Sequence, residues 1–161
     1  MENIDIKEMF ADHVKSYDAW YFGSVTVPAN GTIPLNITVS SDAHFQCKFI
    51  TGTFTTLDAA GADGGANGCS MLLRDAGRDL NLFNLRIPLS LFFTPGRVRS
   101  SGVAGDPSHQ IFYPTEFNYP FLAGADIEMD FASTLATDNV VNICFMGTKF
   151  RKTFAPGSMD S

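Results

Sequence analysis

The strongest constraint on the fold is an alternation of apolar and polar residues with a period of two, which recurs from residue 21 to residue 150. Residues 126–132 (DIEMDFA) show it most clearly, with Ile127, Met129 and Phe131 at odd positions and the acids Asp126, Glu128 and Asp130 at even positions. Such residues point to opposite faces of a β-strand. About eight segments of this kind follow one another, and no helix between them is long enough for a parallel crossover. The pattern predicts an all-β fold, either an antiparallel β-sandwich or a jelly roll.

Local signals refine this expectation. The expected strands are residues 21–27, 32–39, 43–57, 69–74, 85–93, 110–125, 126–132 and 139–150. Asn30-Gly31 joins the first two strands, and this pair predicts a tight hairpin because both residues tolerate positive φ. Gly52 predicts a bulge in the third strand. The last strand is apolar on both faces, so it is expected to lie centrally in a sheet or to cover a partner.

The 161 residues are expected to form one domain with two short extensions. An N-terminal arm, residues 1–19, precedes a β-sandwich domain, residues 20–152, and a C-terminal tail, residues 153–161, follows it. In the arm, apolar residues that include Phe10 recur at helical spacing and predict a short amphipathic helix over residues 4–15. So short a helix is marginal alone, so it is expected to dock on this domain or on a neighbouring subunit.

The charge of the chain argues against two classes of partner. The net charge is -6 at pH 7, whereas nucleic-acid-binding proteins usually present a basic face. An anionic membrane surface would repel an acidic chain, and no apolar run approaches the ~20 residues that span a bilayer. We therefore expect no nucleic acid and no membrane among its partners.

The cysteines and carboxylates offer little evidence for a metal or a cofactor. Cys47, Cys69 and Cys144 are odd in number and lack a Cys-x-x-Cys spacing, which predicts neither a disulfide framework nor a zinc site. Each lies beside apolar residues and is expected to be a buried thiol. No cofactor is expected.

One strand carries three carboxylates on the same face. These acids, Asp126, Glu128 and Asp130, are weak candidates for a Ca²⁺ site, because carboxylate oxygens are ligands for this ion. Calcium loops are rich in turns and have Gly at the bend, unlike this strand. A face that is solvated or packed against another subunit is therefore the favoured interpretation.

Catalytic motifs are not found in the sequence. His109 lies next to Ser108 and near Asp106, but a catalytic triad requires a specific geometry that neighbours in one loop do not easily adopt. There is no Gly-x-Ser-x-Gly motif. The Gly-rich residues 58–68 do not end in the Lys-Ser/Thr of a phosphate-binding loop. We expect the protein not to be an enzyme.

Arginines cluster between residues 74 and 99. Arg74 and Arg78 are each followed by an aspartate around a glycine turn, and guanidinium and carboxylate groups form geometrically specific pairs. Salt bridges within the domain and contacts between subunits both explain this cluster, since Arg is enriched at interfaces. The candidate interface residues are Phe10, Arg74, Arg78, Arg86, Arg97, Arg99, Tyr113, Phe117 and Tyr119.

The order of features along residues 21–150 is a further indication of function. An N-terminal hairpin leads into SDAHFQCKFITGTFTT, followed by RDAGRDL, IPLSLFFTPG, the aromatic-proline passage FYPTEFNYPFLAGADIEMDF and the final NVVNICFMGTKF. This order resembles that of small β-rich virion proteins of tailed bacteriophages, of the minor capsid, decoration or neck type. The resemblance implies a non-enzymatic structural protein of the virion, assembled in the cytoplasm of the host bacterium. Its partners would be other copies of itself and other virion proteins, such as major capsid or neck proteins.

The composition agrees with a subunit of an assembly. Only 17% of residues are charged and 15 are Phe, so part of the apolar surface is expected to be hidden against other subunits. The alternative is a host-receptor or carbohydrate-binding module on the virion, for which Tyr113, Phe117, Asn118 and Tyr119 are the candidate contact residues.

Overall fold

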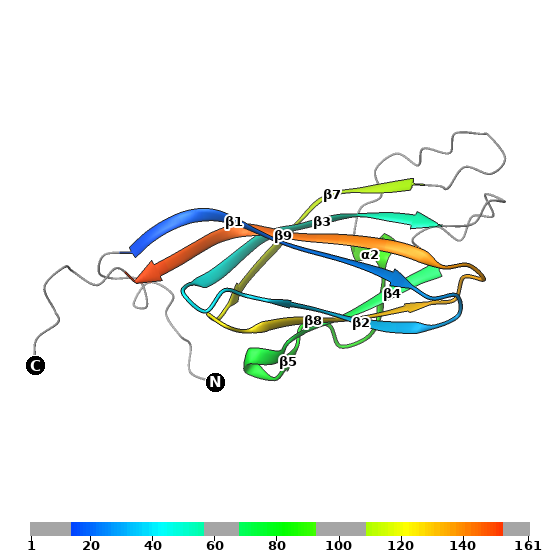
Figure 1. The fold of residues 1–161 in the computed structure, drawn as a ribbon, viewed down its shortest axis with the longest axis horizontal. Coiled ribbons are helices and arrows are strands. Elements are labelled where there is room, and N and C mark those ends of the chain that lie inside the picture. Colours follow the sequence, from blue (N-terminus) through cyan, green and yellow to red (C-terminus); the bar gives the residue numbers. More distant parts are fainter. Residues whose placement is uncertain (1–13, 57–67, 93–108, 153–161) are drawn as a thin grey trace, which may run out of the picture.

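Two antiparallel sheets, stacked face to face, make up the computed structural model, which describes residues 14–56, 68–92 and 109–152 (Figure 1). The first, sheet A, has the strand order β1 (Val14–Val27), β9 (Asn139–Lys152), β3 (His44–Thr56) and β7 (His109–Phe121). The second, sheet B, has the order β2 (Thr32–Thr38), β8 (Asp126–Ser133), β4 (Cys69–Asp75) and β5 (Leu80–Asn81), and β6 (Ile87–Pro88) also pairs with β4. Two short helices complete the described part: η2 (Ala76–Arg78) and α2 (Leu89–Phe92).

The strand order is that of a jelly roll. Strands from the two ends of the chain pair with each other, β1 with β9, β2 with β8 and β3 with β7, and successive pairs alternate between the sheets. Such an order arises when one long antiparallel hairpin is rolled up into two layers. The predicted fold class is therefore confirmed.

The predicted hairpin between the first two strands is wrong, although the turn itself is present. Gly31 N–H donates a hydrogen bond to the carbonyl of Pro28 (3.1 Å), and Asn30 has a φ of 48°. However, β1 belongs to sheet A and β2 to sheet B, so the turn connects the two layers. A Cβ placed on Gly23 of β1 would lie 2.9 Å from the side chains of Leu35 and Ile37 of β2. The two strands therefore face each other across the interior, where their apolar side chains pack.

The start of the domain also differs from the expectation. β1 begins at Val14 and pairs with β9 from its first residue, Val14 with Lys152. Residues 14–19, assigned to the arm, thus belong to sheet A, and the last two residues of the expected helix over 4–15 are strand. The rest of that helix, and the tail at 153–161, lie outside the described residues.

The expected strand over residues 85–93 is replaced by a two-residue strand and a helix. β6 ends at Pro88, and α2 follows at once. Proline has no N–H to donate to the ladder, so pairing with β4 stops there.

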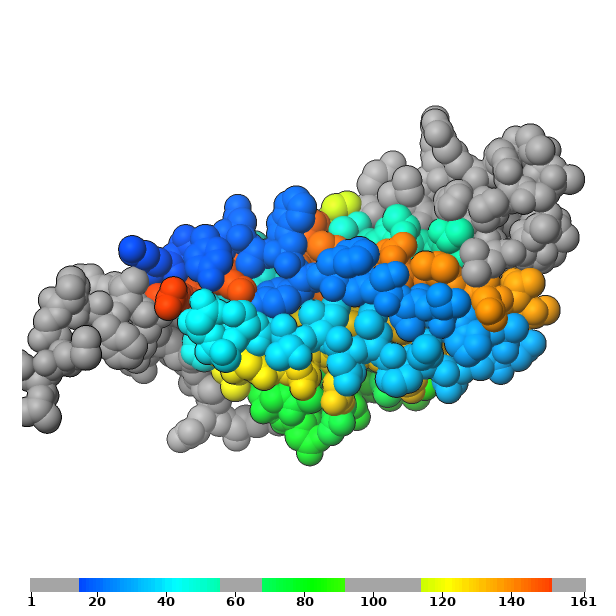
Figure 2. Space-filling model, viewed as in Figure 1, coloured from blue at the N-terminus to red at the C-terminus, as the bar shows by residue number. Residues whose placement is uncertain are grey.

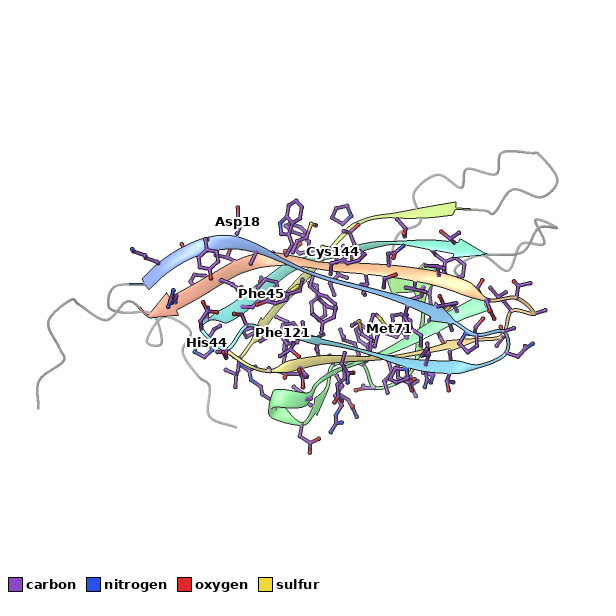
Figure 3. All side chains as sticks on the ribbon, viewed as in Figure 1. Asp18, His44, Phe45, Met71, Phe121 and Cys144 are labelled. Atoms are coloured by element: carbon purple, nitrogen blue, oxygen red, sulfur yellow. The ribbon has the colours of Figure 1, made fainter. Side chains whose placement is uncertain are left out.

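The core lies between the sheets. Phe45, Phe121 and Met71 are fully buried and occupy the space between the two layers (Figure 3). In β8, buried and partly exposed residues alternate as the sequence predicts. β9 lies between β1 and β3, which confirms its expected central position. Within the described ranges, no helix has the length and apolar character needed to cross a membrane.

The predicted bulge at Gly52 is confirmed. The register between β3 and β7 shifts between Ile50 and Gly52, and a second shift falls between Cys47 and Phe49. A Cβ on Gly52 would overlap the carbonyl oxygen of Asn142. Close approach of the neighbouring strand therefore requires glycine at this position.

Candidate interaction surface

The outer face of sheet A carries an exposed apolar cluster. Trp20 on β1 and Phe49 on β3 are both register partners of Met146 on β9, and Phe22 is the partner of Cys144 in the next row. Trp20 is 74% exposed, Phe22 65% and Phe49 42%. We call these five residues, Trp20, Phe22, Phe49, Cys144 and Met146, the sheet A patch. Figure 2 shows the β1 surface in blue, with side chains protruding along the upper edge of the view.

Strand alternation explains why these side chains point outward. Val25 and Val27 of β1, like Tyr21, point inward and pack in or against the core. Trp20 and Phe22 have the opposite parity and therefore lie on the outer face. Exposed apolar groups in a contiguous cluster, unlike single ones, indicate an interaction site.

Polar residues border the sheet A patch. The adjacent row consists of Ser24, Asn142 and Thr53, in which the Asn142 amide donates a 2.8 Å hydrogen bond to the Thr53 hydroxyl. Exposed charged side chains adjoin the patch at its edges: Asp18 two residues before Trp20, Lys48 just before Phe49, and Glu116 of β7 as the register partner of Phe49. An apolar centre with a polar rim is the usual anatomy of a protein–protein interface.

The three thiols do not share one environment. Cys47 and Cys69 are fully buried, as predicted, and burial raises the pKa of Cys47 to about 12 and that of Cys69 to about 11. Cys144 is only partly buried, since it lies on the outer face of sheet A. Desolvation also raises the pKa of Cys144. The prediction of a buried thiol is therefore wrong for Cys144.

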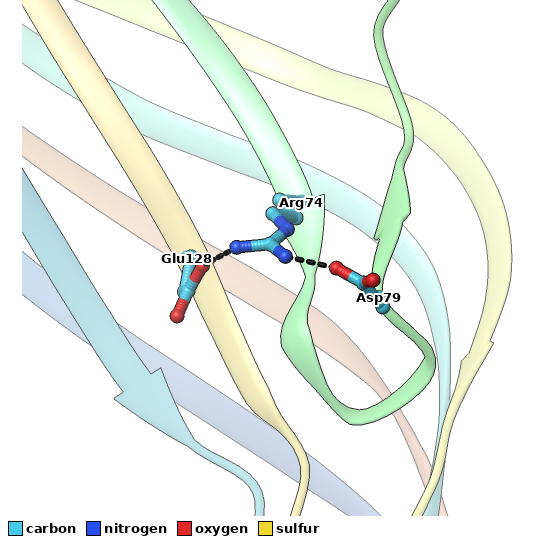
Figure 4. A network of polar contacts seen from close by, with 3 residues as sticks. All are labelled: Arg74, Asp79 and Glu128. Carbon is cyan, nitrogen blue, oxygen red and sulfur yellow. Dashed lines mark hydrogen bonds and ion pairs between the residues drawn. The ribbon is translucent and has the colours of Figure 1, made fainter.

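The outer face of sheet B is, in contrast, covered with ion pairs. Arg74 Nη1 donates to Glu128 Oε2 (3.0 Å), and Arg74 also pairs with Asp79 (Figure 4). The hydrogen bond and ion pair with Asp79 are the main reasons that the pKa of Arg74 is raised. A surface depression of about 340 Å³ beside these residues is lined by Pro34, Asn36, Leu72, Arg74, Glu128, Met129 and Asp130.

Each of the three carboxylates of β8 has its own partner. Thr38 donates a 2.6 Å hydrogen bond to Asp126, Arg74 pairs with Glu128, and Arg86 pairs with Asp130. Among the described residues, no group of three or more His, Cys, Asp or Glu side chains is placed to hold a metal ion. All three acids of the row are thus paired within the domain.

Arg78 belongs to a partly buried cluster between the sheets. Its Nε lies 3.9 Å from Oδ2 of the fully buried Asp75, and its guanidinium lies 5.6 Å from the ring centroid of Tyr119. Desolvation, followed by the hydrogen bond to Asp75, raises the pKa of Tyr119. All three described arginine candidates, Arg74, Arg78 and Arg86, therefore have partners within the domain, and an intersubunit role for them stays a prediction.

The other predicted site residues are dispersed. Phe10, Arg97 and Arg99 lie outside the described residues, and only the backbone of Tyr113 is described, in β7. Phe117 and Tyr119 pack against the core, so they do not present a sugar-binding platform on the surface. Asn118 accepts a 2.9 Å hydrogen bond from Gln46.

No family model matches the sequence, and no curated protein is significantly similar to it.

Proposed function

We propose that this protein is a structural subunit of a phage particle, of the minor capsid, decoration or neck type, which buries the sheet A patch against a neighbouring subunit. It acts without catalysis, through the area that it covers. The single observation that carries this proposal is the exposure of Trp20 and Phe22 together on a regular sheet face. Aromatic residues in such positions commonly dominate the energy of an interface.

The contrast between the two outer faces supports an orientation for the subunit. Sheet A presents apolar side chains with a polar border, whereas sheet B presents charged side chains that are already paired with one another. Exposed ion pairs stay hydrated when their face remains in contact with solvent, so leaving them there costs little free energy. We infer that sheet A faces the neighbour and sheet B faces the solvent.

The fold is compatible with this role but does not select it. Jelly rolls serve as viral capsid domains, as lectins and as cupins, and function depends on the site that a fold carries. Among the described residues, the buried interior is apolar apart from Asp75, Ser133, Asn139 and Thr148. The candidate sugar-contacting aromatics with described side chains pack on the core, so no observation favours the carbohydrate-binding alternative.

Incorporation into particles tests the proposal. Phage particles that carry the wild-type gene are purified on a density gradient, and the amount of this chain per major shell protein is measured. We expect a fixed ratio for the wild type and a loss of more than half of the chain with Trp20→Ser. Leu85→Ser is the matched control, because Leu85 is 76% exposed but lies outside sheet A.

The control should be incorporated like the wild type, and both variants should retain the far-ultraviolet circular dichroism of the folded chain. Particles that lack the wild-type chain would refute the virion role. Full incorporation of Trp20→Ser would show that the sheet A patch is not the docking surface.

A further inference from the structure

We propose that the neighbour on the sheet A patch is a second copy of this chain, packed face to face about a two-fold axis parallel to β9. This inference rests on the proposed function, because it names the subunit that covers the patch. Three features of the outer face of sheet A point to a second copy: its charge, the arrangement of its rows, and the charges at its rim.

The first feature is that the centre of the face is uncharged. The chain has a net charge of -6, so two copies repel each other in most orientations. None of the five residues of the sheet A patch is charged, and the adjacent row of Ser24, Asn142 and Thr53 is neutral as well. The middle of the face can therefore pair with itself without a charged group in the contact. The exposed carboxylates of Asp18 and of Glu116, the β7 register partner of Phe49, lie at its edges.

The second feature is the symmetry of the rows about β9. Trp20 and Phe49 lie on opposite sides of Met146. A two-fold axis parallel to β9 exchanges these sides, so Trp20 of each copy faces Phe49 of the other. The same operation sets the two copies of Cys144 opposite each other. A two-fold contact uses the same surface on both subunits and requires this kind of self-complementarity.

The third feature is the position of opposite charges at the rim. Asp18 of β1 and Gln46 of β3 are both register partners of Thr148, so they lie at the same level along β9. The β3 bulge follows Gln46, and Lys48 within it is exposed. The two-fold axis therefore brings Asp18 of each copy toward Lys48 of the other, which gives two opposite-charge contacts per dimer.

Sedimentation equilibrium of the full chain over a concentration series tests the contact. We expect the mass to double reversibly with concentration. Trp20 is the only tryptophan, so its emission should move to shorter wavelength in parallel with the mass. Phe22→Ser should stay at the monomer mass, whereas the matched control Leu85→Ser should dimerise like the wild type.

Charge reversal tests the orientation. At low ionic strength, Asp18→Lys or Lys48→Glu alone should raise the dissociation constant of the dimer about tenfold. This is the effect expected from the loss of two ion pairs at the rim. The double variant should recover most of the wild-type affinity. Because both side chains are exposed, neither change is expected to unfold the chain, and circular dichroism verifies this.

A chain that stays monomeric at every concentration would overturn the inference. A dimer that survives Phe22→Ser, or a double reversal that is no better than the single ones, would do so too. If particles take up the chain through the sheet A patch while the purified chain is monomeric, the proposed function holds and a second copy is the wrong occupant. If the purified chain dimerises through the patch but particles lack it, a second copy is the right occupant and the virion role is wrong.

Discussion

The hydroxyl of Tyr119 on β7 donates a 2.9 Å hydrogen bond to Oδ2 of Asp75 on β4, which joins the two sheets through one buried carboxylate. Asp75 is completely buried, and its Oδ1 has no hydrogen-bond donor among the described residues. Arg78 completes the cluster, with Nη1 3.5 Å from the Tyr119 hydroxyl. The buried carboxylate depends on both neighbours, because leaving a buried acceptor unpaired is costly.

Tyr119→Phe should therefore destabilise the fold although it preserves the ring. We expect the free energy of unfolding to fall by about 1–3 kcal/mol, the cost of removing one partner from a buried acceptor. Urea denaturation measures this loss. Tyr17→Phe is the control, since Tyr17 is 44% exposed and should change stability by less than about 0.5 kcal/mol. Equal effects of the two changes would show that Asp75 does not need the Tyr119 hydroxyl.

Arg78→Ala and Arg86→Ala distinguish a buried pair from a surface pair. The Arg86 ion pair with Asp130 lies at the surface, so its loss should cost less than about 1 kcal/mol. Loss of Arg78 leaves the charge of Asp75 uncompensated and should cost more in the same unfolding experiment. Neither change should alter the mass of the assembled form. A change in that mass with Arg78→Ala would indicate that this side chain also crosses an interface.

The buried thiols predict a loss of stability at alkaline pH. Burial raises the pKa of Cys47 to about 12 and that of Cys69 to about 11, from an ordinary value of 9.0. Between pH 9 and the raised pKa values, the unfolded chain releases thiol protons that the folded chain retains. Stability is therefore full below pH 9 and falls above it. The expected slope is about 1.4 kcal/mol per pH unit for each thiol.

Urea denaturation at pH 8 to 10.5 measures this slope, because the range brackets the start of the loss. Cys47→Val should flatten the pH dependence, since it removes one of the two thiols with the larger pKa shifts. Cys144→Ser is the comparison, because Cys144 is only partly buried. A slope that Cys47→Val leaves unchanged would contradict the assignment to buried thiols.

Gly147→Ala should be among the most damaging single changes in β9. A Cβ on Gly147 would overlap the carbonyl oxygen of Gln46 and lie 2.9 Å from the Cα of Cys47. Both obstacles are backbone atoms of the neighbouring strand, which cannot move aside as a side chain can. We expect the free energy of unfolding to fall by about 3 kcal/mol or more.

Gly124→Ala is the matched control for the loss of a glycine. Gly124 has a φ of 75°, but its nearest neighbour would be 3.9 Å from the added Cβ. The cost there is backbone strain alone, about 1–2 kcal/mol. Equal losses at the two positions in thermal unfolding would show that β3 and β9 are free to separate near Gly147.

Only part of the charge pairing can be anticipated from the sequence. Arg74 and Arg78 each have an aspartate as the next residue, and a salt bridge within the domain is one of the two explanations that this spacing supports. The structure pairs Arg74 with Asp79 and Glu128. The adjacent Asp75 is instead the partner of Tyr119 and Arg78. Charge pairing depends on which strands lie side by side, and sequence spacing does not define this.

The sheet A patch, in contrast, does not follow from the sequence pattern. Both parities of β1 carry large apolar side chains, Trp20 and Phe22 on one and Tyr21 and Val25 on the other. Alternation therefore cannot decide which set faces the core. The same ambiguity exists in β9. Apolar residues on both of its faces predict either a central strand or a face that covers a partner. In β1 it is the tertiary structure that distinguishes the two sets.

By itself, the sequence determined the positions of most strands and the all-β class, because the two-residue alternation is local and follows from strand geometry. It also indicated the turn at Asn30 and the bulge at Gly52, since both depend on backbone conformation at one position. Only the tertiary structure decided that the turn connects two layers, that β1 pairs with a strand more than 100 residues away, and that Trp20 faces outward. These are choices between alternative long-range pairings of similar strands, and they are settled by which complete set of side chains packs into one core.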